Sequence, residues 1–389
     1  WRGWANSLSI PPCTERTRSL ILRSALILRS LCYGPTGAIY AAATTSLPEW
    51  PGGCRNWDYR YCWPRDASLA ATALTRLGNT GVGARLLEYL LRIVDTCLSP
   101  ERLRPIYTVL STELGPEAEL PHLPGYRYSS PIRLGNAAAE QVQLDVFGAI
   151  VDLVYVMARA GTALTSDHWR LVEAMVTAVE RRWDEPDHGV WEIRDERQHH
   201  VYSKVMCWQA VDRAIRIAEE CMDIRRDAWQ ELRDRIRDEV VERGWCDTLG
   251  AYAASYDEPE ADASALQIGL SGLLDADDPR FLATIAVVEK QLRRGPTVYR
   301  YRFNDRLPGG EGGFHLCTSW LIGAYVRAGR LDDALSLFHD LAALAGPTGT
   351  LAEQYCPIER LALGNVPQAY SHLGLINAAL ALIEAGVSV

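Results

Sequence analysis

Two glutamates lie in surroundings that suit acid–base chemistry. Glu192 directly follows Trp191, and a carboxyl group packed against an apolar ring tends to have a raised pKa because burial disfavours its charged form. Such a group can act as a general acid near neutral pH. Glu353 is followed by Gln354 and Tyr355, whose amide and phenol groups would let it stay ionised and hold a water. A pair of carboxyl groups with these two roles is what glycoside hydrolysis requires.

Charged and indole side chains are concentrated just before one predicted helix. Arg65 offers a rigid fork of donors and Asp66 beside it offers two acceptors, so the pair could grip vicinal sugar hydroxyls. The ring of Trp57 or Trp63 would then stack against the bound sugar. A structural Arg–Asp network that holds the loop is an equally good interpretation. The excess of 12 Trp and 17 Tyr over 5 Phe fits both a sugar cleft and an ordinary core.

Another segment, Gly295–Gly313, carries Arg300 in a Tyr-Arg-Tyr-Arg run and Glu311 among glycines. Its glycines form neither a GxGxxG nor a GxxxxGK pattern, so no phosphate cradle is predicted. The HExxH and GxSxG motifs are also absent from the sequence. Ser371 and His372 could form a nucleophile pair, but a helix cap explains them equally well. No metal-ligand cluster stands out, and we expect neither a metal nor a cofactor.

Helical periodicity dominates the segments that must position these residues, and long alternating strand patterns are nearly absent. One short alternation, from Val190 to Arg194, predicts an extended piece around Glu192. The apolar spacing predicts twelve helices. They are Glu15–Leu31, Asp66–Leu77, Gly81–Thr96, Asn136–Arg159, Ser166–Arg182, Ser203–Glu220, Arg225–Arg243, Asp262–Leu270, Asp278–Arg293, Phe314–Ala328, Leu331–Leu344 and Pro367–Glu384.

The connections between these helices alternate between tight turns and long loops rich in Gly, Pro and aromatic residues. Loops of this length inside a compact domain are usually functional. Because each long loop leads into the second helix of a pair, we expect an all-α (α/α)6 barrel with its long loops at one end. An irregular multi-helix domain is the alternative. The long loops are Tyr33–Pro64, Ser99–Gly135, Trp183–Tyr202, Gly244–Ala261, Gly295–Gly313 and Ala345–Val366.

Composition excludes several classes of protein. The net charge of -9 and the lack of a basic stripe argue against a nucleic-acid partner. No apolar run reaches the roughly 18 residues that a membrane span needs. The ten scattered cysteines contain no CxxC pair, which favours reduced core thiols and a cytoplasmic protein. The start at Trp1 without a methionine indicates a fragment of a longer chain, and no split point divides residues 1–389 into two domains.

Several runs of these loops, in their order along the chain, resemble glycoside hydrolase family 15, which includes glucoamylases, glucodextranases and bacterial trehalases. The resemblance implies an (α/α)6 catalytic domain, preceded in bacterial members by an N-terminal β-sandwich. The sequence departs from the family pattern at Cys54, Pro64 and Cys356. The similar runs are Thr44–Glu49, Arg55–Ser68, His122–Tyr126, Gly135–Asp145, Gly189–Arg194, Tyr202–Met206, Val298–Gly312, Leu351–Tyr355 and Gly364–Asn377.

The resemblance also implies roles for individual residues. By position, Glu192 is the general acid and Glu353 the general base. Arg65 and Asp66 fall on the pair that holds the terminal glucose at the non-reducing end. The other predicted substrate-binding residues are Trp57, Trp63, Trp191, Lys204, Arg300, Glu311 and Tyr355.

The expected activity is that of an inverting, exo-acting α-glucoside hydrolase, which releases β-glucose from α-1,4- or α-1,6-linked glucans or oligosaccharides. Inversion needs room for a water, so the two carboxyl groups should lie roughly 6.5–9.5 Å apart. An α,α-trehalase of the same family is the alternative, and the loops Ser99–Gly135 and Gly295–Gly313 would decide between the two. A non-catalytic sugar-binding protein and an α/α-barrel lyase are weaker alternatives. The sequence contains no signal for an oligomeric state.

Overall fold

The computed structural model describes residues 2–256 and 258–389, so residues 1 and 257 of the predicted domain lie outside the described residues. Each of the twelve predicted helices has a counterpart, and a short additional helix, α1 (Arg2–Asn6), precedes them. The counterparts are α2 (Glu15–Ser30), α3 (Pro64–Arg76), α4 (Thr80–Thr96), α5 (Val146–Arg159), α6 (Ser166–Arg182), α7 (Val201–Met222), α8 (Asp227–Arg243), α9 (Gln267–Leu270), α10 (Pro279–Leu292), α11 (His315–Arg327), α12 (Leu331–Ala343) and α13 (Ala369–Glu384).

Six helices form a closed inner ring. Helices α3, α5, α7, α9, α11 and α13 pack against one another in this order, and α13 packs against α3 to close the ring. Helices α2, α4, α6, α8, α10 and α12 pack outside it, each against a neighbouring inner helix or the turn that leads into it. The predicted (α/α)6 toroid is therefore confirmed.

Burial patterns explain which helices are inside. Helix α13 is apolar around most of its circumference and buries 12 of its 16 residues, as an inner helix must. Helix α8 buries only Leu232, Ile236 and Val240. These residues are four apart and form a single stripe, which is the pattern of an outer helix with one covered face.

Two helix starts differ by more than two residues from the sequence prediction. The predicted helix Asn136–Arg159 begins only at Val146, because Ala137–Glu140 forms a separate 3-10 turn whose cap, Asn136, accepts from the Ala138 N–H. The predicted helix Asp262–Leu270 is a 3-10 turn, Ala263–Leu266, followed by the short α9. Both inner helices therefore begin after an irregular segment that reaches toward the barrel end carrying the long loops.

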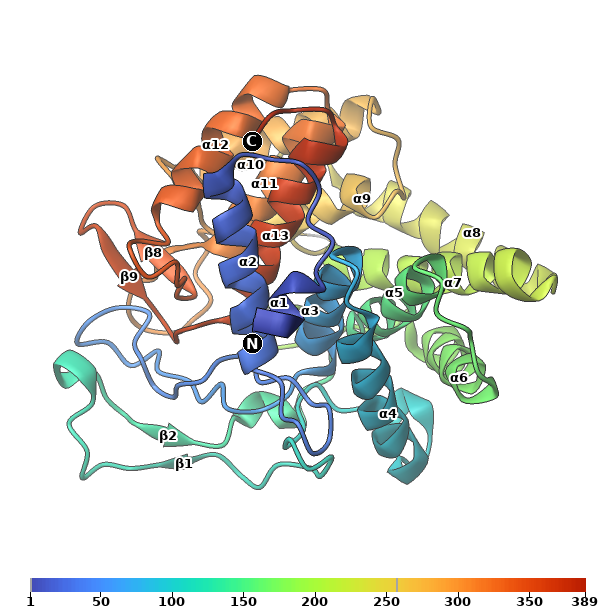
Figure 1. Cartoon of the computed structure of the whole chain (residues 1–389), viewed down its shortest axis with the longest axis horizontal. Coiled ribbons are helices and arrows are strands. Elements are labelled where there is room, and N and C mark those ends of the chain that lie inside the picture. Colours follow the sequence, from blue (N-terminus) through green and yellow to red (C-terminus); the bar gives the residue numbers. More distant parts are fainter. Residues whose placement is uncertain (1, 257) are drawn as a thin grey trace.

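Short strands join the long loops on one side of the helices (left and lower left in Figure 1). A five-stranded antiparallel sheet in the order β5-β6-β7-β8-β9 connects the loop before α11 to the loop before α13. Phe314 pairs with Gln354, which brings Glu353 to the mouth of the barrel. The strands are β1 (Ala118–Glu119), β2 (Arg133–Leu134), β3 (Trp245–Cys246), β4 (Ala251–Tyr252), β5 (Arg293–Arg294), β6 (Thr297–Val298), β7 (Gly313–Phe314), β8 (Gln354–Cys356) and β9 (Leu361–Leu363).

Within the described part of the chain, no helix is both long and apolar enough to cross a bilayer. Across the same residues, no cluster of three or more His, Cys, Asp or Glu side chains is arranged to hold a metal ion. All ten cysteines are free thiols.

Candidate active site

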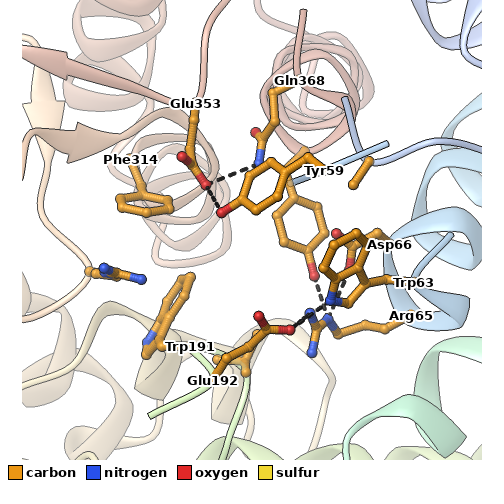
Figure 2. A pocket seen from close by; sticks show the side chains of 13 residues that line it. Tyr59, Trp63, Arg65, Asp66, Trp191, Glu192, Phe314, Glu353 and Gln368 are labelled. Carbon is orange, nitrogen blue, oxygen red and sulfur yellow. Dashed lines mark hydrogen bonds and ion pairs between the residues drawn. The ribbon is translucent and has the colours of Figure 1, made fainter. Parts of the chain in front are cut away.

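A pocket lies at the loop end of the barrel, with Glu192 and Glu353 on opposite walls (Figure 2). Its lining includes seven of the residues predicted from the sequence. They are Trp63, Arg65, Asp66, Trp191, Glu192, Arg300 and Glu353. The remaining lining residues are Ala41, Tyr59, Val190, Phe314, Gln368 and Tyr370.

Glu192 lies in a turn and not in the predicted extended piece. Its N–H donates to the Gly189 carbonyl, and its φ of 60° is in the left-handed region, which costs a non-glycine residue about 1–3 kcal/mol. The Gln141 side chain helps to hold this conformation, because its Nε2 donates to the carbonyl oxygen of Glu192 at 3.1 Å. The prediction was wrong because alternation over five residues does not distinguish a strand from a turn.

The two hydrogen bonds to the Glu192 carboxyl group fall on the same oxygen. Trp63 Nε1 donates to Oε1 at 2.6 Å, and Gln143 Nε2 donates to it at 3.2 Å. Arg65 Nη2 also lies 3.9 Å from this oxygen. An oxygen that accepts from two donors is a poor place for a proton, so a proton carried by Glu192 belongs on Oε2.

Glu353 is almost fully buried, with 3% of its surface exposed. The Tyr59 hydroxyl donates to Oε1 at 2.7 Å, and Gln368 Nε2 lies 3.5 Å from the same oxygen. Burial and the negative charge of Glu49 raise the pKa of Glu353 to about 8, although the Tyr59 hydrogen bond lowers it. The neighbours in sequence do not supply these contacts, because Gln354 instead accepts from a loop N–H.

Two rings in edge-to-face contact link the carboxyl groups along one side of the pocket (Figure 2). The centroids of Tyr59 and Trp63 lie 5.6 Å apart with an interplanar angle of 76°. Tyr59 donates to Glu353 while Trp63 donates to Glu192, so one aromatic pair holds both acids on their own walls of the pocket (Figure 2).

Arg65 and Asp66 lie in the first turn of α3, where Pro64 occupies the first helical position. A proline is well suited to this position, because its missing N–H would have no partner there and its φ already matches a helix. Arg65 Nη1 donates to Gln143 Oε1 at 2.7 Å and lies 3.1 Å from Asp145 Oδ2. Burial raises the pKa of Asp66 to about 6, against the opposing effect of Arg65. The pair therefore lines the pocket and also belongs to a structural network.

A buried charge cluster lies behind Glu353. Arg300 Nη2 lies 2.6 Å from Glu311 Oε2 and 3.4 Å from Glu49 Oε2. Arg55 makes a paired contact with Asp305, at 2.8 Å from each guanidinium nitrogen to a carboxylate oxygen. Three carboxylates thus face two arginines. Burial, together with the charge of Glu49, raises the pKa of Glu311 to about 7 despite Arg300.

Comparison with known proteins identifies the family. The sequence model described as Glycosyl hydrolases family 15 matches residues 15–380. The chain belongs to this family. Two similar relatives are the trehalases of Mycobacterium tuberculosis and Thermoplasma volcanium, which are 38% and 37% identical over 99% of the chain. The chain spans only 57% and 61% of the length of these two relatives.

Solved structures show the same fold. A bacterial glucoamylase complexed with acarbose superposes with a TM-score of 0.74 at 17% identity and covers 100% of this chain and 59% of its own. A glycosidase variant in complex with glucose gives a TM-score of 0.73 at 22% identity, covering 94% of this chain and 97% of its own. The fold implied by the resemblance to family 15 is therefore confirmed.

Of the substrate-binding residues predicted from the sequence, Trp57 lies outside the pocket lining. The guanidinium groups of Arg133 and Arg194 lie over its ring, at 4.7 and 4.2 Å from the centroid. Its Nε1 donates to Glu49 Oε1 at 2.8 Å. Trp57 therefore ties three loops together, and cations lie over its ring where a sugar would have to stack.

Lys204, Glu311 and Tyr355 also lie outside the lining. The correction is greatest for Lys204, which is fully buried and whose Nζ donates to the carbonyl oxygens of Trp183 and Glu185. Glu311 lies behind the lining as an ion-pair partner of Arg300, which does line the pocket. Tyr355 lies in strand β8, is only half-buried, and does not line the pocket.

Sequence reasoning missed Tyr59, Phe314, Gln368 and Tyr370, which line the pocket. Gln368 caps α13 and Tyr370 lies in its first turn, as Arg65 and Asp66 do in α3. The first turn of an inner helix after a long loop was the signal that could have found them. Cys54, Pro64 and Cys356, where the sequence departs from the family 15 pattern, do not line the pocket.

Proposed function

We propose that the chain is the catalytic part of an α,α-trehalase that hydrolyses its substrate with inversion. The observation that carries the reaction type is the pair of carboxyl groups on opposite walls of one pocket. The choice of substrate is supported by relatives named trehalase that are 38% identical over 99% of the chain. The glucoamylase and glycosidase structures, at 17% and 22% identity, support only the fold.

In this proposal Glu192 is the general acid. Its Oε1 is occupied by the Trp63 and Gln143 donors, so Oε2 carries the proton and gives it to the glycosidic oxygen as the bond breaks. The left-handed backbone of Glu192 fits a residue held for function, because such strain persists only where surrounding contacts enforce it.

Glu353 is the general base, and it takes a proton from the attacking water on the opposite face of the sugar. Its Oε1 accepts from Tyr59, while its buried Oε2 has no hydrogen-bond partner among the described residues. The carboxyl group therefore keeps unused acceptor capacity for a water. A pKa of about 8 makes Glu353 a stronger base than an ordinary glutamate once it is ionised.

The sugar at the reacting position would be held by Arg65 and Asp66. Arg65 has its Nε and Nη1 engaged by protein groups, and Nη2 faces the Glu192 side of the pocket. Trp191 and Phe314, in edge-to-face contact at 5.6 Å, provide apolar surface for the C–H face of a pyranose.

The glucoamylase-like activity favoured by the sequence is the second candidate, and a substrate panel separates the two. Purified chain is incubated with trehalose, maltose, isomaltose, starch and a uronide polymer, and free glucose is measured. We expect kcat/KM for trehalose to exceed that for each α-glucan substrate. A higher kcat/KM for maltose or starch would favour a glucoamylase activity over a trehalase activity. Binding without turnover of any substrate would reject both activities.

A further inference from the structure

A second cavity, of about 260 Å³, lies within the ring of inner helices on the side away from the catalytic pocket. Each inner helix contributes to its wall. One lining residue from each, in the order α3, α5, α7, α9, α11 and α13, is Arg76, Asp152, Gln209, Gln267, Trp320 and Asn377.

Helix geometry places this axial cavity at the far end of the barrel. Arg76 is eleven residues beyond Arg65 on α3, which corresponds to about 16 Å along the helix axis. Asn377 is seven residues beyond Tyr370 on α13, or about 10 Å. Arg65 and Tyr370 line the catalytic pocket, so the two cavities are stacked along the barrel axis.

Unpaired polar groups face the axial cavity. Gln209 is 7% exposed, yet its side-chain amide has no hydrogen-bond partner among the described residues. Across the same part of the chain, the amide of Gln267 and the indole N–H of Trp320 likewise make no hydrogen bond. Neither amide has a fully buried unpartnered atom, so both are open to the cavity, and each offers a donor and an acceptor to an occupant.

The charged groups at this cavity are already compensated. Arg213 Nε lies 2.9 Å from Asp152 Oδ1, and a second nitrogen of Arg213 contacts Asp212. Arg76 pairs with Glu384 at 2.8 Å and donates to Asn377. The wall therefore selects neither an anion nor a cation, and it combines neutral amides with an indole ring.

We propose that the axial cavity is a binding site for a small, uncharged, polyhydroxylated molecule of monosaccharide size. The Gln209 and Gln267 amides hydrogen-bond its hydroxyl groups, and Trp320 packs against its C–H surface. Amides that can donate and accept, together with one aromatic ring, match the alternating donors, acceptors and apolar faces of such a molecule.

An aromatic contact chain links this site to the catalytic pocket. Trp320 lies 6.0 Å from Tyr202 in a stacked arrangement and 5.8 Å from Trp191, measured between ring centroids. Trp191 forms a wall of the catalytic pocket and precedes Glu192. An occupant in contact with Trp320 therefore changes the environment of tryptophans at both sites, which provides a fluorescence signal for binding.

The test uses D-glucose as the probe. Wild-type chain, Gln209→Leu and the surface control Gln230→Leu are titrated by calorimetry and by tryptophan fluorescence, with folding checked by thermal melting. We expect two binding events in the wild type and in Gln230→Leu. In Gln209→Leu one of them weakens about tenfold, the effect of one or two lost hydrogen bonds, while the other is unchanged. Gln267→Leu serves as an independent second variant.

A crystal structure with D-glucose locates the sites directly. Glucose density between Gln209 and Trp320 supports the proposal. Glucose in the catalytic pocket alone, with only water in the axial cavity, overturns it, as does binding that neither Gln209→Leu nor Gln267→Leu alters. Because the measurement is of binding, it is independent of whether the chain hydrolyses trehalose.

Discussion

At the scale of single residues, the two acids differ in how the protein surrounds them. Glu192 receives two neutral donors on one oxygen, whereas Glu353 is buried beside a cluster with more carboxylates than arginines. The cluster makes ionisation of Glu353 dependent on its neighbours, and Glu49 is the neighbour whose charge raises its pKa most.

The pH profile tests this dependence. A base must be deprotonated to act, so kcat/KM should fall about tenfold per pH unit below about pH 8. Glu49→Gln removes a negative charge that raises the pKa of Glu353, and the acid limb should move to lower pH. Glu289→Gln, which removes a carboxylate from an ion pair with Arg330 on the outer layer, should leave the limb in place. If the acid limb of the kcat/KM profile moves to higher pH in Glu49→Gln, the assignment of Glu353 as the base is contradicted.

Gly364 provides a steric test of the same carboxyl group. A Cβ at this position would lie 2.4 Å from Glu353 Oε2, so Gly364→Ala must displace the carboxyl group and should lower kcat about 100-fold. Gly346 is the matched control, because its φ is also positive, at 59°, and nothing lies within 4 Å of its added Cβ. Both variants should lose about 1–2 kcal/mol of stability from backbone strain. Equal kcat values in the two variants would show that the position of Glu353 is not critical.

At the scale of elements, loops from distant parts of the chain are held together by stacked cations and rings. The guanidinium groups of Arg133 and Arg194 lie over the Trp57 ring, and Arg194 also pairs with Glu117 at 3.1 Å. The loop that carries Glu192, the loop before α3 and the loop before α5 are therefore one connected unit.

Trp57 and Trp191 should have different roles, the first in stability and the second in substrate binding. Trp57→Phe loses the hydrogen bond to Glu49 and should destabilise the chain by about 1–3 kcal/mol, with KM for a small α-glucoside nearly unchanged. Trp191→Phe loses pocket surface and the contact to Asp262, which is 2.8 Å from Nε1, and should raise KM. Thermal melting and steady-state kinetics on both variants measure this. A tenfold rise in KM for Trp57→Phe would restore it as a sugar-binding wall.

Elements with a periodic signal were predictable from the sequence. Apolar spacing identified all twelve long or paired helices and the end of the barrel where the loops meet. The late start of α5 was not predictable, because Ala137–Glu140 consists of good helix formers and the interruption comes from tertiary contacts of Gln141 and Gln143. The prediction for Lys204 was also wrong, because its side chain turns inward and donates to backbone carbonyl groups.

At the scale of the whole molecule, the buried carboxyl group of Glu353 lowers the stability of the folded chain. Burial and a neighbouring charge raise the pKa of Glu353 from 4.5 to about 8. A raised pKa means that the folded state binds the proton more tightly than the unfolded state. Stability therefore declines as pH rises from about 4.5 to about 8, and the loss remains above that range.

Glu353→Gln should remove this loss. The variant should be inactive yet more stable than the wild type at pH 8.5, by about 1–2 kcal/mol. The difference should vanish at pH 4, where Glu353 is neutral in both states. Thermal melts at the two pH values measure it, with Glu384→Gln, a surface carboxylate, as the control. A variant that is less stable than the wild type at pH 8.5 would contradict the raised pKa.

The most direct test of the central claim is the anomeric form of glucose released from α,α-trehalose, followed by proton NMR before mutarotation. Inversion with Glu192 as acid and Glu353 as base converts one glucose to the β-anomer and releases the other as the α-anomer. The account predicts equal initial amounts of the two anomers, and turnover that is abolished by Glu192→Gln and by Glu353→Gln. Release of α-glucose alone would indicate retention and contradict the paired acid–base assignment.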